Sequence, residues 1–250
     1  MMSERQKRHL EFGSWNLELV LLQGSQISER KVEMAVVTIE RKVLQKNDEL
    51  ARQNRELFAR NGVFVINLVS SPGSGKTSLL ERTFQHLNGK IKVAVIEGDV
   101  QTDLDAQRVA KFGVPVVQIV TNGGCHLEAK LVQDALGSID LNGVDLLVIE
   151  NVGNLVCPAG YDLGEAMKVV IASTTEGDDK PLKYPAMFRN ASVLIINKID
   201  LIPYVNCSLS ELKKNALQIN PKLTVFETSC TTNAGIPEWS KWLLEKSRKP

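Results

Sequence analysis

The chain has 250 residues, of which 43% are hydrophobic and 24% are charged, as in ordinary globular proteins. Its formal net charge is +1 at pH 7 and it has no dense run of Lys or Arg, which argues against nucleic-acid binding. The longest apolar runs, such as Val63–Val69, are too short to cross a membrane, and the charged start of the chain does not resemble a signal peptide. Four scattered cysteines do not resemble a disulfide framework, so we expect a reducing, cytoplasmic setting.

The segment from Ile27 to Arg60 contains no Gly or Pro and is rich in Glu, Arg, Lys, Gln and Leu. Apolar residues between Val32 and Leu44 recur near helical spacing, which predicts one or two amphipathic helices ending near Asn61-Gly62. We therefore expect a helical extension over residues 1–61, serving at least as a packing or spacer element, ahead of a main domain over residues 62–250.

Short runs rich in Val and Ile alternate with helical patterns after Gly62, and these runs lack the alternation of a half-exposed strand. Such strands are typical of a parallel sheet with helices on both faces. The pattern predicts an α/β fold with a doubly wound, mostly parallel sheet, in which ligands bind at the carboxyl ends of the strands. The expected strands are Val63–Val69, Lys92–Glu97, Val114–Ile119, Leu146–Glu150, Met167–Ala172, Ser192–Ile196 and Thr224–Phe226.

The first expected strand is followed by a sequence typical of a phosphate-binding loop. It matches the second half of the Walker A pattern, with Ser70 where that pattern prefers glycine. Glycines allow backbone N–H groups to turn toward phosphate oxygens, Lys76 can reach the β- and γ-phosphates, and the Thr77 hydroxyl can ligate Mg²⁺. We expect nucleotide phosphates to bind at Gly73, Ser74, Gly75, Lys76, Thr77 and Ser78.

The run Asn197-Lys198-Ile199-Asp200 after another strand is typical of a guanine-binding motif. The Asp200 carboxylate can accept hydrogen bonds from two N–H positions that guanine offers and adenine does not, so GTP and GDP are the expected nucleotides. The Lys198 stem can lie over the base, while Asn197 can hold the loop. Ser229 and Cys230, after the strand Thr224–Phe226, are weaker candidates for the base pocket.

Two further strand ends carry acids, in Glu97-Gly98-Asp99 and in Glu150–Gly153. We expect Asp99 and Glu150 to hold Mg²⁺ and to orient the attacking water, with Lys76 as the third catalytic residue. Gly153 can offer a backbone N–H to the γ-phosphate and act as a switch element. The alternative for Asp99 is a helix cap, with Asp103 and Asp105 in the first turn of that helix. The sequence indicates no arginine finger, so we expect slow unaided turnover.

Cys125 and His126 follow a glycine-rich loop that opens a helix, and Cys157 lies shortly after Gly153. Thiolate and imidazole ligands suit Zn²⁺ and Ni²⁺. No spacing rule joins the three residues, so a buried cysteine and a capping histidine stay open as the alternative. Three ligands also leave a tetrahedral metal incomplete, unless a two-fold dimer joins two such loops or one position stays open for metal transfer.

Taken in order along the chain, these motifs resemble the hydrogenase nickel-incorporation GTPases of the HypB family, in the SIMIBI class of P-loop GTPases. The resemblance covers Val63 to about Leu244, and Gly124-Cys125-His126 and Asn154–Pro158 make it specific. It implies a GTP-hydrolysing metallochaperone, a nucleotide-dependent homodimer that binds Ni²⁺ or Zn²⁺ through Cys125, His126 and Cys157. It further implies nickel delivery during [NiFe]-hydrogenase maturation, with a HypA-type nickel chaperone and the hydrogenase large subunit as partners.

The chain departs from that family in one respect, because it has no Cys before Cys125 and only three His, whereas many members carry an N-terminal Cys-x-x-Cys-x-Cys site or a His-rich tract. High-affinity N-terminal metal binding is therefore not expected. Cys207 is expected to be structural, and His9 and His86 to lie at the surface. The competing interpretations are a urease-type nickel GTPase, a cobalamin-enzyme GTPase chaperone, and a metal-binding adaptor that its nucleotide merely locks as a dimer.

Overall fold

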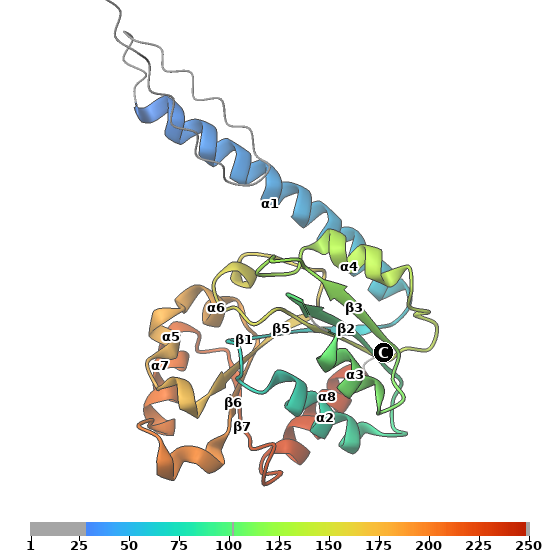
Figure 1. Ribbon diagram of the computed structural model, residues 1–250, viewed down its shortest axis with the longest axis vertical. Coiled ribbons are helices and arrows are strands. Elements are labelled where there is room, and N and C mark those ends of the chain that lie inside the picture. The colour runs from blue at the N-terminus through green and yellow to red at the C-terminus, as the bar shows by residue number, and fades with distance from the viewer. Residues whose placement is uncertain (1–28, 102, 249–250) are drawn as a thin grey trace, which may run out of the picture. The chain divides into compact units, whose positions relative to one another are not determined.

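The computed structural model describes residues 29–101 and 103–248, with side chains described from Val43 onward (Figure 1). His9 lies outside the described residues. Two compact units divide the chain, residues 1–40 and residues 41–250. The expected boundary at residue 62 marks the end of the first helix, whereas the second unit already begins at Arg41, because the last turns of that helix pack on the sheet domain.

The expected N-terminal helix is present as one continuous helix, α1, over Glu29–Arg60. It ends where Gly62 adopts a left-handed φ of +67°, a conformation that glycine reaches without strain. In the last turns of α1, Ala51 and Phe58 are buried, while Arg52 and Glu56 form an exposed pair one turn apart. Most of the apolar positions between Val32 and Leu44 that carried the amphipathic prediction lie where side chains are not described, so that prediction stays a prediction.

Seven strands among the described residues form one sheet, in the order β3-β2-β4-β1-β5-β6-β7, and every neighbouring pair is parallel. This confirms the predicted doubly wound α/β fold. The bounds differ from the expected ones by at most two residues at either end, and Leu146–Glu150 agrees at both ends. The strands are β1 Phe64–Ser70, β2 Val93–Asp99, β3 Val116–Val120, β4 Leu146–Glu150, β5 Met167–Ser173, β6 Val193–Asn197 and β7 Thr224–Glu227.

Helices cover both faces of the sheet, as the unbroken apolar strands require (Figure 1). They are α2 Lys76–Leu87, α3 Leu104–Ala110, α4 Ala129–Leu136, α5 Lys180–Lys183, α6 Pro185–Asn190, α7 Leu209–Ile219 and α8 Ile236–Ser247. Short 3₁₀ turns lie at η1 Cys157–Ala159, η2 Thr174–Glu176 and η3 Ile199–Tyr204.

The apolar side chains of each strand alternate between the two faces of the sheet. One core lies between the sheet and α2, α3 and α8, where Trp239 is fully buried and donates its indole N–H to Thr83 at 3.0 Å. On the other face, one cluster joins the sheet to α4 and the end of α1, and a second joins it to α6 and α7. The parallel strands are thereby fixed from both sides, and their carboxyl ends share one edge.

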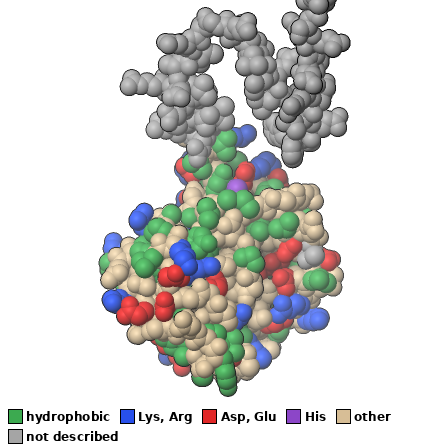
Figure 2. Space-filling view, turned by 60° about the vertical axis from the view of Figure 1, so that its left-hand side comes forward, with side chains coloured by type: hydrophobic (Ala, Val, Ile, Leu, Met, Phe, Trp, Pro, Cys, Tyr) green, Lys and Arg blue, Asp and Glu red, His purple; other side chains and the backbone are tan. Residues whose placement is uncertain are grey.

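The surface carries charges of both signs, as the small net charge implies. On the face drawn in Figure 2, Lys and Arg side chains are interspersed with Asp and Glu side chains and with apolar groups. Among the described residues, no helix combines the length and apolar character needed to cross a membrane.

Candidate functional site

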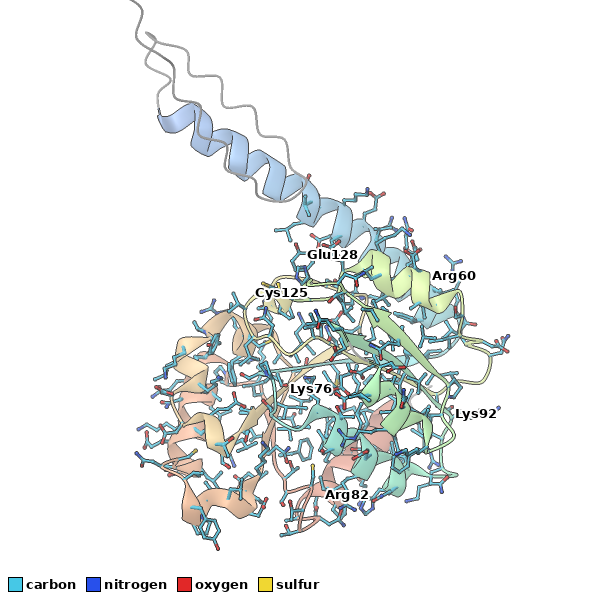
Figure 3. The ribbon with its side chains drawn as sticks, in the orientation of Figure 1. Arg60, Lys76, Arg82, Lys92, Cys125 and Glu128 are labelled. Atoms are coloured by element: carbon cyan, nitrogen blue, oxygen red, sulfur yellow. The ribbon has the colours of Figure 1, made fainter. Side chains whose placement is uncertain are left out.

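The phosphate loop connects β1 to α2, at the centre of the sheet edge (Figure 3). Lys76 begins α2, and its Nζ lies 3.2 Å from Ser70 Oγ and 4.0 Å from Glu150 Oε1. Gly75 has a left-handed φ of +97°, and a Cβ there would lie 2.6 Å from the Asn197 amide nitrogen. Both the backbone conformation and this close approach require glycine, so the Walker-type pattern has a structural cause at this position.

The Asn197–Asp200 segment is hydrogen-bonded directly to the phosphate loop. Asn197 is buried, and its side chain donates to Ser74 O at 2.9 Å and accepts from Thr228 Oγ1 at 3.2 Å. Lys198 Nζ donates to Gly73 O at 2.7 Å. Two segments more than 100 residues apart are therefore joined, with the Asn197 side chain hydrogen-bonded to the phosphate loop.

Ser229 and Cys230, the other candidates for the base pocket, differ in what their side chains contact. The Ser229 hydroxyl is buried and accepts from the N–H groups of Thr231 and Thr232 at 3.2 and 3.1 Å, so it holds the turn of its own loop. Cys230 Sγ lies 3.6 Å from Asn197 Oδ1. Burial raises the pKa of the Cys230 thiol, against the hydrogen bond with Asn197 and the charge of Arg82.

Carboxylates from three elements gather beside Lys76. Ligand atoms of Glu97, Asp105 and Glu150 lie within 4.8 Å of one another, and Thr77 Oγ1 donates to Glu150 Oε1 at 3.0 Å. Glu97 and Glu150 are 2% and 1% exposed, and each has one buried carboxylate oxygen without a hydrogen-bond partner among the described residues. Desolvation, followed by the charge of Glu150, raises the pKa of Glu97 to about 11. Burial also raises the pKa of Glu150, against the attraction of Lys76.

Asp99, expected to be a magnesium ligand, is not part of this cluster. The strand register gives the reason, because Glu97 pairs with Glu150 on the neighbouring strand, whereas Asp99 lies two residues further along and pairs with Val120 of β3. The Asp99 carboxylate accepts from Gln101 N at 2.8 Å. Glu97 and Asp105 therefore take the place in the cluster that the sequence had assigned to Asp99.

Arg108 is a candidate functional residue that the sequence interpretation missed. A cavity of about 300 Å³ over the phosphate loop is lined by Gly73, Gly75, Lys76, Thr77, Ser78, Asp105, Arg108, Glu150 and Lys198. The Arg108 guanidinium is held by Glu81 at 2.8 Å, by Asp105 at 3.0 Å and by Ser78 Oγ at 3.2 Å. Its position three residues after Asp105 on one helix face was the available signal.

Gly153 approaches the phosphate loop from the end of β4. A Cβ at Gly153 would come within 3.0 Å of the Pro72 backbone, so only glycine allows this contact without a shift. The segment after β4 is therefore in a position to sense what the phosphate loop holds.

Cys125, His126 and Cys157 come together although no spacing rule joined them in the sequence. Their ligand atoms lie within 4.8 Å of one another, with the two Sγ atoms 3.0 Å apart and Cys125 Sγ 3.5 Å from His126 Nδ1. Cys125 lies in the loop before α4, apart from Lys76 at the start of α2 (Figure 3). A set of two sulfurs and one imidazole suits a borderline or soft divalent metal.

The surroundings of this trio favour ligation over helix capping. The His126 ring lies 4.0 Å from the Tyr161 ring, and its Nε2 is buried without a hydrogen-bond partner among the described residues. Burial lowers the pKa of His126, against the opposing charge of Glu128, which favours the neutral imidazole that binds metals. The hydrogen bond with Cys157 raises the pKa of the Cys125 thiol.

Cys207 and His86 lie outside these clusters. Cys207 is half-buried against the core beneath α6 and α7, in keeping with a structural role. His86 makes a hydrogen bond of 3.3 Å with Asn233.

The chain is similar to known proteins over most of its length. Residues 64–227 match the nucleotide-binding domain of the CobW/HypB/UreG family. The hydrogenase maturation factors HypB of Azotobacter vinelandii and Escherichia coli are 51% and 48% identical to the chain, covering 85% and 83% of it and 70% and 72% of their own lengths.

Two solved structures are similar as well. HypB from Helicobacter pylori in complex with nickel is 42% identical, with a TM-score of 0.78 over 81% of this chain and 95% of that one. HypB from Archaeoglobus fulgidus is 38% identical, with a TM-score of 0.77 over 82% of this chain and 100% of that one.

The buried acid pair yields a prediction about Glu97→Gln. Because the pKa of Glu97 is raised in the folded state, its cost to stability is small near pH 4.5 and grows as the pH rises toward about 11. Glu97→Gln removes this cost, so without Mg²⁺ and nucleotide we expect a gain on the order of 1 kcal/mol at pH 8, or ~2–4 °C in Tm. Calorimetry in chelator at pH 5 and pH 8 tests this, and an equal or larger gain at pH 5 would contradict it.

The cysteine pair yields a prediction about pH. Cys125 must lose its proton to bind a metal, and its pKa is raised, whereas the lowered pKa of His126 keeps the imidazole neutral. Apparent Ni²⁺ affinity should therefore rise between pH 6.5 and 8.5, by about tenfold per pH unit for each proton released. Titration of the thiolate-to-nickel absorption band measures it, with Cys207→Ala as the matched control. A flat profile would show that the thiols are not the ligands.

Proposed function

Because the chain belongs to the CobW/HypB/UreG family, and within it to the HypB hydrogenase maturation factors, we propose that it is a GTP-hydrolysing metallochaperone for nickel. Its task would be to assist nickel insertion during [NiFe]-hydrogenase maturation. One observation carries this proposal. Cys125, His126 and Cys157 form a sulfur and imidazole cluster on loops that follow β3 and β4, and β4 also ends in the acid that faces the phosphate loop.

The chain's own residues account for the steps of GTP binding and hydrolysis. Backbone N–H groups around Gly73 and Gly75 receive the phosphates, and Lys76 leaves Ser70 to neutralise the β- and γ-oxygens. Asp200 accepts from the guanine edge and Lys198 covers the base. Glu150, held by Thr77, is placed to orient the attacking water, and Arg108 is close enough to the cavity to offset charge that develops in the transition state.

The acid cluster also fits a magnesium ion. Hard oxygen ligands with unpartnered buried lone pairs, on Glu97 and Glu150, are the donors that this cation prefers. Thr77, Glu150, Glu97 and Asp105 would hold it, with Asp99 beyond the first ring of ligands. The ion would supply positive charge against the β- and γ-phosphates, and it would offset the desolvation and the like-charge repulsion that raise the pKa of Glu97.

Nickel is the cargo of the proposed cycle. The nucleotide state acts on the segment after β4, because Gly153 touches the phosphate loop and Cys157 lies four residues further. A homodimer formed in the GTP state would join two trios and complete the metal coordination, and hydrolysis would loosen it. Zn²⁺ competes for the same donors.

The partners and the setting follow from this role. A HypA-type nickel chaperone would exchange metal with the trio, and the hydrogenase large subunit would receive the nickel. Two thiols 3.0 Å apart remain metal ligands only while reduced, so we place the protein in the cytoplasm.

A second recipient is suggested by one comparison. A Helicobacter pylori relative, 42% identical over 85% of this chain, carries the name hydrogenase/urease maturation factor HypB. The nickel carried by this chain could on that ground serve a urease as well as a hydrogenase. The remaining alternative is an adaptor whose nucleotide only locks the dimer, without appreciable hydrolysis.

The main experiment compares two variants by three measurements. Lys76→Ala should lower phosphate release from GTP by at least about 100-fold, since it removes the charge facing the transferred group, and should leave nickel binding intact. Cys125→Ala should do the reverse, with near-normal hydrolysis and loss of nickel. Metal content, oligomeric state and phosphate release are measured in apo, GDP and GTP-analogue forms. Hydrolysis near background in the wild type would favour the adaptor, and nickel retained by Cys125→Ala would refute the metal site.

Base specificity gives an independent prediction. Asp200→Asn replaces one acceptor oxygen by a donor, so guanine loses a hydrogen bond while xanthine, with a carbonyl at the same place, gains one. GTP affinity should fall by about 100-fold or more, and xanthosine triphosphate should become the better ligand. Competition binding with both nucleotides checks this, and an unchanged preference for GTP would place the base elsewhere.

A further inference from the structure

We propose that a buried chain of polar side chains, Asn151–Asn67–Glu165–Lys168, couples the nucleotide site to both metal-binding loops, with Asn151 as its positioning residue. The proposal rests on the metal and GTP sites proposed above and names the route between them. These four residues are at most 9% exposed, and none of them lies among the metal or nucleotide ligands.

This chain of polar side chains crosses a face of the sheet that is otherwise apolar. Asn67 of β1 is paired in register with Lys168 of β5, and both lie between the cluster beneath α4 and the cluster beneath α6 and α7. Buried polar groups of this kind are costly unless each one is hydrogen-bonded. Their retention at the centre of a close-packed core therefore needs a reason beyond filling space.

Two hydrogen bonds and one ion pair join the four residues. Asn151 Nδ2 donates to Asn67 Oδ1 at 3.3 Å, and Asn67 Nδ2 donates to Glu165 Oε1 at 3.1 Å. Glu165 Oε1 lies 3.8 Å from Lys168 Nζ. The direction of each bond is forced, because the Asn151 oxygen faces two backbone N–H groups at one end and a carboxylate receives the last amide at the other.

Both ends of the chain hold metal-binding loops. At one end, Asn151 Oδ1 accepts from Leu127 N at 3.1 Å, directly after His126. At the other, Lys168 Nζ donates to Pro158 O at 2.9 Å, directly after Cys157, and to Tyr161 O at 3.0 Å. The Tyr161 ring in turn lies against His126. The chain therefore fixes the separation of the two loops that carry the three metal ligands.

Asn151 also belongs to the nucleotide side. It directly follows Glu150 of the acid cluster, and its Oδ1 accepts from Val152 N at 3.0 Å, one residue before Gly153. A displacement of Gly153 by a bound γ-phosphate therefore pulls on the same oxygen that holds Leu127. The amide chain carries that pull across the sheet to Pro158, so both metal loops respond together.

The test compares Ni²⁺ affinity between GTP-analogue and GDP forms, read from the thiolate-to-nickel absorption band. In the wild type we expect the two affinities to differ by roughly 5- to 150-fold, the usual range of such couplings. Asn151→Asp keeps the acceptor for Leu127 and Val152 but sets an oxygen against Asn67 Oδ1. We expect its ratio to fall to within about twofold of 1, while nickel and GTP each still bind.

Two further variants separate coupling from general damage. Asn151→Asp combined with Glu165→Gln lets the Asn67 amide turn over, so that the two amide hydrogen bonds re-form in reverse with the same net charge. The ratio should then rise clearly above that of Asn151→Asp, but not fully to the wild-type value, because the ion pair with Lys168 is lost. This pair also replaces the single variant if that one does not fold. Asn220→Asp is the matched control, because it also replaces an amide donor by an oxygen, here one that donates to three backbone carbonyls away from both sites, and its ratio should stay at the wild-type value.

The outcomes distinguish failure of the coupling route from failure of the proposed function. A wild-type ratio in Asn151→Asp, or a ratio near 1 in the folded double variant, overturns the coupling route and leaves the proposed function standing. Absence of nickel binding or of any nucleotide effect in the wild type overturns the proposed function and the route together.

Discussion

The position of β4 between β1 and β2 is the constraint on which the site depends. A central parallel strand has one register with each neighbour, and here that register sets Glu150 beside Glu97 on β2 and beside Leu68 on β1. The phosphate loop leaves β1 at the same edge. The segment that follows β4 therefore reaches the phosphate loop with Gly153 and the cluster of Cys125 and His126 with Cys157. A shift of one residue would turn the side chains of β4 to the opposite face and separate all of these groups.

In the acid cluster this arrangement brings two buried carboxylates close together, which is electrostatically unfavourable when both are ionised. Two carboxylates that are nearly inaccessible to water share one lysine, and neither has all its oxygens satisfied by the described residues. A close-packed sheet of Val, Ile and Leu on both sides makes such a cluster tolerable, because the surrounding core overdetermines its geometry. A bound cation would relieve the repulsion between these carboxylates, so the proposed magnesium site is least favourable when it is empty.

Much of the fold could be predicted from the sequence, because continuous Val and Ile runs, helical spacing and Gly75-Lys76-Thr77 are local signals. The guanine-binding motif was local as well. The place of Glu97 rather than Asp99 beside Glu150 depends on strand register, which no local pattern encodes. The trio at Cys125, His126 and Cys157 is assembled by two loops 32 residues apart, so the residues alone left it open and only the family resemblance singled it out. Arg108 was hidden for a related reason, since its cavity forms only when α3 packs beside α2.

The polar chain through the core has a consequence for how such sequences can diverge. The orientation of each amide is dictated by the next group along, from two backbone donors to one carboxylate. A single replacement at position 67, 151 or 165 reverses one dipole and leaves its neighbours mismatched, whereas compensated pairs restore the pattern. These positions should therefore be inherited as a block, with change at one accompanied by change at another. An ordinary apolar core position, where Val can be exchanged for Ile, does not depend on its neighbours in this way.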